Sequence, residues 1–194
     1  MYSKFYRQLS VLFAGLLISG YGFAQSWTLV DFTTPGNYTW TPPPGCTKYF
    51  AQVWGAGAGG GFDCGGGGGS FSQSIEYQDY FGSCPITVGA GGTIGGNGGE
   101  SSFRGARAYG GRGNCQSQIS YPPVYEMVVT HKGGEGGYNT ANFSWSMGGG
   151  GGGSAETGSN GTNGQDAFIY DGYGGAGTGF GGNGGYPGNF PGGG

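Results

Sequence analysis

The chain has 194 residues, of which 53 are glycine, and only 9% are charged. Aromatic residues make up 16%, which argues against a disordered chain because such chains are poor in aromatics and rich in charge. Glycine stays below one third of the residues and there are only 9 prolines, so the chain is not a collagen.

The first 24 residues have the pattern of a secretory signal peptide. Lys4 and Arg7 provide a basic start, an apolar stretch follows over residues 9–18, and Gly22-Phe23-Ala24 is a small-x-small cleavage site. An uncleaved membrane anchor is the alternative, which the shortness of the apolar stretch disfavours. Cleavage after Ala24 leaves five basic and ten acidic residues, and a net charge of −5 disfavours nucleic acid and anionic membranes as partners. We therefore expect a secreted protein, extracellular or on a cell surface, with no membrane span in its mature form.

Strand patterns alternate with turn residues after this leader. Residues 27–32 and 38–40, joined by Pro35-Gly36-Asn37, predict a β-hairpin. Further short strands are predicted at 49–54, 70–77, 85–88 and 101–103. The spacing predicts a mainly β fold, with a small β-sandwich or jelly-roll-like module and glycine-rich loops within residues 25–114.

Residues 115–131 interrupt the glycine pattern. They contain Tyr121-Pro122-Pro123 and a strand-like run at 125–130. This composition predicts an inserted loop or hairpin between the module and the glycine-rich C-terminal region, residues 132–194.

Glycine blocks such as 65–69 and 148–153 can form neither a helix nor an ordinary strand. They are either disordered or packed backbone against backbone, as in a polyglycine or polyproline II bundle whose neighbouring coils exchange hydrogen bonds. We expect residues 132–194 to pack on the module in this way, and a partly flexible linker is the alternative. The expected backbone-packing positions are Gly55, Gly57, Gly59, Gly91, Gly92, Gly98 and Gly99.

The four cysteines predict two disulfides, because an exported chain with an even number of cysteines favours bridges. Three pairings are open, and the spacing does not choose between them. The four residues are Cys46, Cys64, Cys84 and Cys115.

Catalytic, metal and cofactor motifs are weak. The GxGxxG at 55–60 follows a predicted strand, but the glycines after it cannot form the helix that a dinucleotide-binding turn requires. One calcium-type nonapeptide at 161–169 leaves weak calcium binding at Asp166 open, although such sites need tandem copies. His131 is the only histidine, and we interpret it as an exposed loop residue. The sequence therefore predicts no catalytic residues, no metal site, no cofactor and no enzyme.

Four segments, taken together, resemble a known family. They are 32–42 (FTTPGNYTWTP), 53–61 (VWGAGAGGG), 86–92 (ITVGAGG) and 98–103 (GGESSF). Their succession is similar to the glycine-rich domains of phage tail proteins and bacterial surface proteins. The resemblance implies glycine-rich coils packed into a sandwich, with loops that contact a host surface as in tail-tip adhesins of T-even-type phages. The leader, the cysteines and the 115–131 insertion depart from the phage pattern and favour a bacterial extracellular protein.

Two functional hypotheses follow. The first is a self-assembling structural subunit of an extracellular filament, sheath or matrix, whose partner is the protein itself as a homopolymer. The alternative is an adhesin that binds a glycan or a cell surface, because aromatic rings stack well on sugars. Ice binding ranks lower, because no regular file of threonine or alanine is present. The candidate surface-binding residues are Tyr121, Tyr125, His131 and Trp145.

Overall fold

The fold is described by a computed structural model over residues 27–61, 64–77, 82–113, 128–137 and 157–166. The expected leader lies outside these residues. The chain divides into two compact units, residues 1–32 and 33–194, and the strands of the described residues all belong to the second unit. Among the described residues, no helix is long and apolar enough to cross a membrane.

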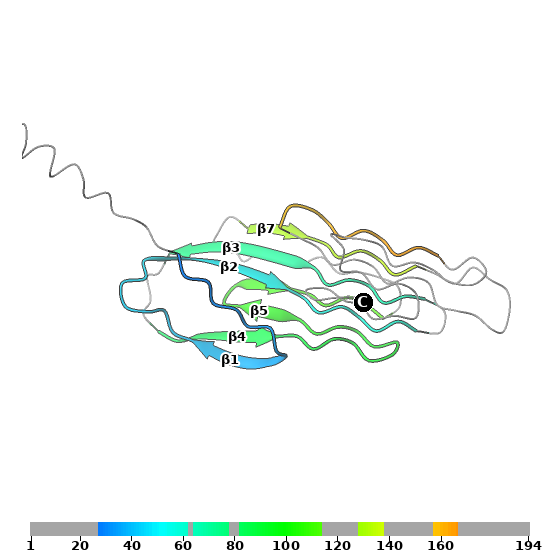
Figure 1. The fold of residues 1–194 in the computed structure, drawn as a ribbon, viewed down its shortest axis with the longest axis horizontal. Helices are drawn as coiled ribbons and strands as arrows, with labels where there is room; N and C mark the ends of the chain where they lie inside the picture. Colours follow the sequence, from blue (N-terminus) through cyan, green and yellow to red (C-terminus); the bar gives the residue numbers. More distant parts are fainter. Residues whose placement is uncertain (1–26, 62–63, 78–81, 114–127, 138–156, 167–194) are drawn as a thin grey trace, which may run out of the picture. The chain divides into compact units, whose positions relative to one another are not determined.

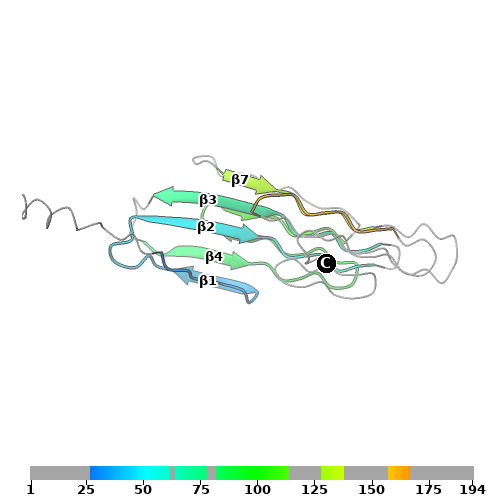
Figure 2. The ribbon, with the colours of Figure 1, turned by 45° about the horizontal axis from the view of Figure 1, so that its top comes forward.

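Seven strands form two antiparallel sheets in the described part of the chain (Figures 1 and 2). One sheet has the order β1 (Gly36–Trp40), β4 (Cys84–Val88), β5 (Ser101–Phe103) and β6 (Ala106–Ala108). The other has the order β2 (Lys48–Trp54), β3 (Phe71–Tyr77) and β7 (Val128–His131). The predicted mainly β fold with two sheets is confirmed, and neither sheet closes into a barrel.

The predicted hairpin between 27–32 and 38–40 is wrong. Residues 27–32 contain no strand, and β1 pairs instead with β4, from Gly36 opposite Val88 to Trp40 opposite Cys84. The strand-like run at 125–130 contributes β7, which pairs with β3 rather than forming a hairpin of its own in the described residues. A local pattern identified the strands, but the partner of an edge strand depends on contacts far away in the sequence.

The inner faces of the two sheets meet through an aromatic cluster. Trp40, Tyr49 and Phe103 come from β1, β2 and β5, and each ring contacts the other two edge-to-face, with centroids 5.4 to 5.8 Å apart. Tyr49 and Phe103 are buried. The Tyr49 hydroxyl also accepts a hydrogen bond from Arg104, which has a left-handed φ of 51° in the turn between β5 and β6. The cluster therefore ties the turn of one sheet to the other sheet.

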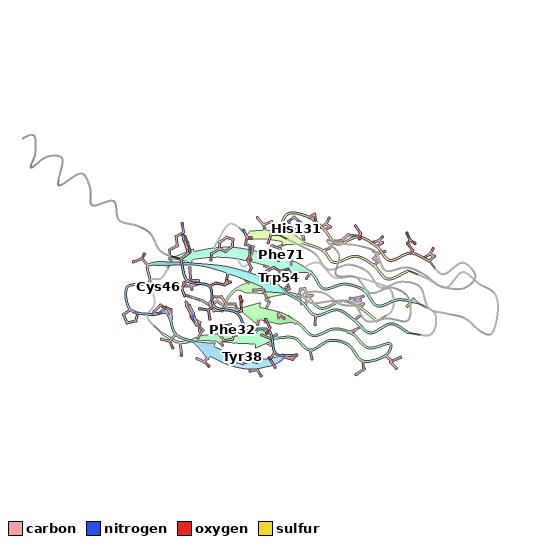
Figure 3. All side chains as sticks on the ribbon, viewed as in Figure 1. Phe32, Tyr38, Cys46, Trp54, Phe71 and His131 are labelled. Atoms are coloured by element: carbon pink, nitrogen blue, oxygen red, sulfur yellow. The ribbon has the colours of Figure 1, made fainter. Side chains whose placement is uncertain are left out.

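Glycine-rich coils continue directly from the strands. Coil 55–61 follows β2, coil 64–70 leads into β3, coil 89–99 connects β4 with β5, coil 109–113 follows β6, and coil 132–137 follows β7. In both views these coils run on side by side from the ends of the strands (Figures 1 and 2). Figure 3 shows side chains crowded on the strands and sparse on the coils. In the second unit, side chains are therefore available to hold the strands together, whereas the coils have few side chains for this purpose.

Hydrogen bonds between the coils repeat every third residue. The N–H groups of Gly55, Ala58 and Gly61 donate to the carbonyls of Ser70, Gly67 and Cys64, at 2.8 to 2.9 Å. Coil 64–70 bonds to coil 132–137 with the same spacing, through Gly65 to Gly137 and Gly68 to Gly134. Three residues per turn is the period of the polyproline II helix. The described coils therefore form the bundle predicted from the glycine blocks.

The coils also exchange hydrogen bonds between the two layers. Coil 55–61 extends the β2–β3–β7 sheet, yet Ala56 and Gly59 donate to Gly99 and Gly96 of the coil that extends the other sheet. A strand directs its backbone groups within its own sheet, whereas a three-fold coil directs them outward on three sides. Backbone hydrogen bonds therefore join the layers of the bundle, where side chains join the layers of the sandwich.

Candidate binding surfaces

Most of the glycines expected to pack backbone on backbone leave no room for a side chain. An added Cβ would come closer than 3.0 Å to a backbone atom of another coil, or of a distant part of the same coil. This holds for Gly55, Gly59, Gly92, Gly98 and Gly99. Gly57 accepts a hydrogen bond of 2.9 Å from the N–H of Gly92. Gly91 differs, because a Cβ there would meet nothing within 4 Å.

Other contact glycines, which the glycine blocks alone do not single out, are spaced three residues apart. A Cβ on Gly66, Gly69, Gly133 or Gly136 would come closer than 3.0 Å to a carbonyl oxygen of a neighbouring coil. Each pair is three residues apart. A search for glycines at this spacing, rather than for glycine blocks, is the signal that finds them.

Alanine occurs in coil 55–61 at positions where a methyl group fits. Ala58 is only 3% exposed, so its Cβ is accommodated inside the bundle. Gly55 and Gly59 flank it at positions where a Cβ would collide with a carbonyl oxygen. Glycine in this coil is therefore placed by contact geometry and not by composition alone.

The four cysteines have different environments. Cys46 and Cys84 are free thiols, half-buried and buried respectively, so the structure contains no bridge between them. Cys64 is disulfide-bonded and buried, and its Sγ lies 3.6 Å from the carbonyl oxygen of Gly113. Cys115 lies outside the described residues.

His131 is not an exposed loop residue, which corrects the expectation from the sequence. It ends β7 opposite Phe71, and the two rings are stacked with centroids 6.1 Å apart. Its Nε2 is buried and has no hydrogen-bond partner among the described residues. The other candidate surface-binding residues, Tyr121, Tyr125 and Trp145, lie outside the described residues.

The sheet face that carries His131 combines aromatic and amide side chains. Trp54, Phe71 and His131 are aligned across β2, β3 and β7 (Figure 3), and the Trp54 and Phe71 ring centroids are 5.1 Å apart. The next aligned row contains Gln52 and Gln73, whose amides form a hydrogen bond of 3.1 Å. Phe50, Gln52 and Trp54 alternate along β2 and therefore point to the same face. We call this the β2–β3–β7 outer face.

The edge strands carry few features that would block pairing with another chain. Exposed edges are commonly protected by lysine, proline or a covering segment. β1 has the sequence GNYTW and β7 has VVTH, so neither carries a lysine, a proline or an acidic residue. On β1, Gly36, Asn37 and Thr39 are exposed. Both strands are edges of their sheets in the described part of the chain.

Charged side chains in the described residues form two ion pairs, Arg107 with Glu100 at 3.3 Å and Lys132 with Glu135 at 3.9 Å. No three His, Cys, Asp or Glu side chains in that part of the chain are placed to hold a metal ion. Asp166 is exposed at the end of coil 158–166. Three features of the described residues bear on function: the strand edges, the β2–β3–β7 outer face and the coil backbone.

Comparison with known proteins identifies the family. No significant match was found among curated proteins or among solved structures. A family model described as a glycine-rich domain matches residues 33–194, which is most of the chain and includes all seven strands and the coils described above. The chain belongs to this family of glycine-rich domains.

Proposed function

We propose that this protein is a secreted, non-enzymatic structural subunit that assembles with copies of itself into an extracellular filament, sheath or matrix. The observation that carries the proposal is β1, which is an edge strand among the described residues, has Gly36, Asn37 and Thr39 exposed, and contains no charged residue or proline. Such an edge pairs readily with a strand from another chain, and its main-chain hydrogen bonds supply the affinity. Secretion follows from the signal-peptide pattern of residues 1–24.

The coil bundle supports the same role through its rigidity. Its hydrogen bonds recur every third residue within one layer, as at Gly65 and Gly68, and they join the two layers through Ala56 to Gly99 and Gly59 to Gly96. A body cross-linked by backbone in two directions resists bending and is suited to bear load in a polymer. The exposed coil 158–166 adds to it through Gly161 and Gly164, which donate to the carbonyls of Lys132 and Glu135.

Light scattering after size-exclusion chromatography, together with negative-stain electron microscopy, tests the proposal on the purified protein. We expect particles whose mass grows with protein concentration and which appear as filaments or sheets. A protein that remains monomeric at millimolar concentration would contradict it.

The alternative function, an adhesin for glycans, is favoured by a different observation, the β2–β3–β7 outer face. Phe50 is 43% exposed and lies on the same face as the hydrogen-bonded amides of Gln52 and Gln73, whereas Phe71 is 0% exposed, so Phe50 and the two amides are the groups that a glycan would contact. Aromatic rings bind the apolar faces of sugars, and amides hydrogen-bond to hydroxyl groups. The resemblance to phage tail adhesins supports the same reading.

A glycan array separates the two functions. Binding that is lost in the Phe50→Ala and Gln52→Ala variants, but kept in Ile94→Ala, would favour the adhesin. Ile94 is the matched control because it is an exposed apolar residue, 84% accessible, on a coil turn away from the strands. Silence of the wild-type protein on the array removes this alternative.

A further inference from the structure

Residues Trp27–Phe32 have the composition of a strand but are not in one. They alternate in the pattern that predicts a half-buried strand, and they form no ladder in the structure. Trp27, Leu29 and Val30 are 63%, 84% and 51% exposed. Three large apolar side chains in close succession are thus left accessible to water, which is costly unless another surface covers them.

The edge of the first sheet offers a place for such a strand. β1 is bonded to β4 on one side, and no strand of the described residues lies on its other side. The sequence predicts that 27–32 fills this place within the same chain, as the first half of a hairpin that turns at Pro35-Gly36-Asn37. The structure contains the second half of that hairpin, β1, without the first.

The same pairing can form between two chains. A segment that can add to a sheet edge in its own chain can add to the same edge of a neighbouring copy at little cost in contacts, and the connection from 27–32 to β1 is short, Thr33 to Pro35. Each chain then donates one segment and accepts one. Because the donating and accepting surfaces are different, the contact is heterologous, and its head-to-tail repetition builds an open polymer, whereas reciprocal exchange between two copies would close as a dimer.

We propose that Trp27–Phe32 of one copy adds as an antiparallel strand to the side of β1 that faces away from β4 in the next copy. The proposal rests on the proposed self-assembly and specifies its contact. It buries the exposed side chains of the donor and gives the acceptor edge a hydrogen-bonding partner. The partner is a second copy of this chain, and the direction of the polymer is head to tail.

One variant disables each side of the contact. In Leu29→Lys, a charge replaces the most exposed apolar residue of the donor segment. In Thr39→Lys, a charge is placed on the exposed acceptor edge, which is a device that natural edge strands use against pairing. The control is Ile94→Lys, because Ile94 has the same 84% exposure as Leu29 but lies outside the proposed contact. All three sites are solvent-exposed, so circular dichroism and the thermal midpoint should match the wild type.

We expect the concentration at which polymers appear to rise about tenfold or more in Leu29→Lys and in Thr39→Lys, a factor that corresponds to about 1.4 kcal/mol. The control should polymerise like the wild type. A mixture of the two disabled variants is the decisive sample, because one keeps an intact acceptor and the other an intact donor. The mixture should give a discrete heterodimer on size-exclusion chromatography and no longer species.

The outcomes separate this proposal from the function on which it depends. If the wild type does not polymerise at all, the proposed self-assembly fails and this contact fails with it. If the wild type polymerises and Leu29→Lys does so at the same concentration, self-assembly stands and the donor segment is refuted. If Thr39→Lys alone blocks polymers, β1 pairs with β1 of another copy, and the strand exchange proposed here is wrong. A synthetic peptide of residues 27–32 should also inhibit the wild type by occupying β1, and failure to inhibit would count against it.

Discussion

The substitution of one contact glycine by alanine tests the packing principle of the coil bundle. Gly69 lies in coil 64–70, where an added Cβ would come closer than 3.0 Å to the carbonyl oxygen of Gly55. The obstacle is backbone, so it cannot turn away as a flexible side chain would. The neighbouring hydrogen bonds, from Gly55 to Ser70 and from Ser70 to Tyr109, are both 2.9 Å long and would have to lengthen or break.

The expected loss of stability follows from three contributions. Two backbone hydrogen bonds are worth roughly 1 kcal/mol each, and overpacking costs about 1–3 kcal/mol. The lower entropy of the unfolded alanine chain offsets about 0.4–1 kcal/mol. We therefore predict that Gly69→Ala lowers the free energy of unfolding by about 2–5 kcal/mol. For a chain of this size that corresponds to a fall of roughly 4–20 °C in the thermal midpoint.

Gly91→Ala is the matched control, because a Cβ at Gly91 meets nothing within 4 Å. The free energy of unfolding of this variant should equal that of the wild type or exceed it by up to about 1 kcal/mol, because alanine lowers the entropy of the unfolded chain. Urea denaturation followed by tryptophan fluorescence measures both variants under the same conditions. If Gly69→Ala and Gly91→Ala unfold within about 0.5 kcal/mol of each other, the backbone contacts do not hold the bundle together and the reasoning is refuted.

Three further predictions concern other parts of the fold. Phe103→Ala removes one ring of the aromatic cluster and should cost about 3–5 kcal/mol in chemical denaturation, whereas Ile94→Ala should stay within about 0.5 kcal/mol; equal effects would show that the cluster does not join the sheets. The side chain of Asn163 accepts a hydrogen bond of 3.0 Å from the backbone of coil 132–137, so Asn163→Ala should speed amide exchange in that coil, and unchanged exchange would contradict the contact. Because Cys46 and Cys84 are free, we predict that the disulfide partner of Cys64 is Cys115, and peptide mapping that finds a different pairing would refute this.

Strand positions followed well from the local sequence. The predicted runs at 49–54, 70–77, 85–88 and 101–103 correspond to β2, β3, β4 and β5 to within one residue at each end. In β2, the alternation of buried Tyr49 and Val53 with exposed Phe50 and Gln52 carried the signal. A strand buried on one face can be recognised from this alternation, because the period of two depends on the strand alone.

Pairing was less accessible to sequence reasoning. The turn at Pro35-Gly36-Asn37 indicated a hairpin, but β1 pairs with β4, which begins more than forty residues later. The expectation for His131 fails for a related reason: its immediate neighbours Thr130 and Lys132 are polar, while its ring contact is with Phe71 of β3. The partner of an edge strand depends on the whole sheet, so the local sequence of the strand does not predict it.

The sequence predicts that the glycine-rich coils pack backbone on backbone, but it does not predict which glycines make the contacts. The glycine blocks indicated backbone packing, yet Gly91 was included although it faces open space, and Gly69 was not included although it lies against a carbonyl. The missing element was the phase of the three-residue period. Ala58 lies where the coil leaves room for a methyl group, but Gly55 three residues earlier does not, so the positions depend on the neighbouring coils as well as on the period.

Backbone packing in the coils has a consequence for how the protein responds to temperature. Unfolding normally raises the heat capacity because apolar groups become hydrated, while newly exposed peptide groups lower it. Coils such as 64–70 and 132–137 bury mostly peptide groups and almost no hydrocarbon. The heat capacity increment per residue should therefore fall below the usual value of about 12–15 cal/mol/K. A small heat capacity increment flattens the curve of unfolding free energy against temperature. Cooling or heating would therefore lower the stability of this domain less than that of a protein with a hydrophobic core.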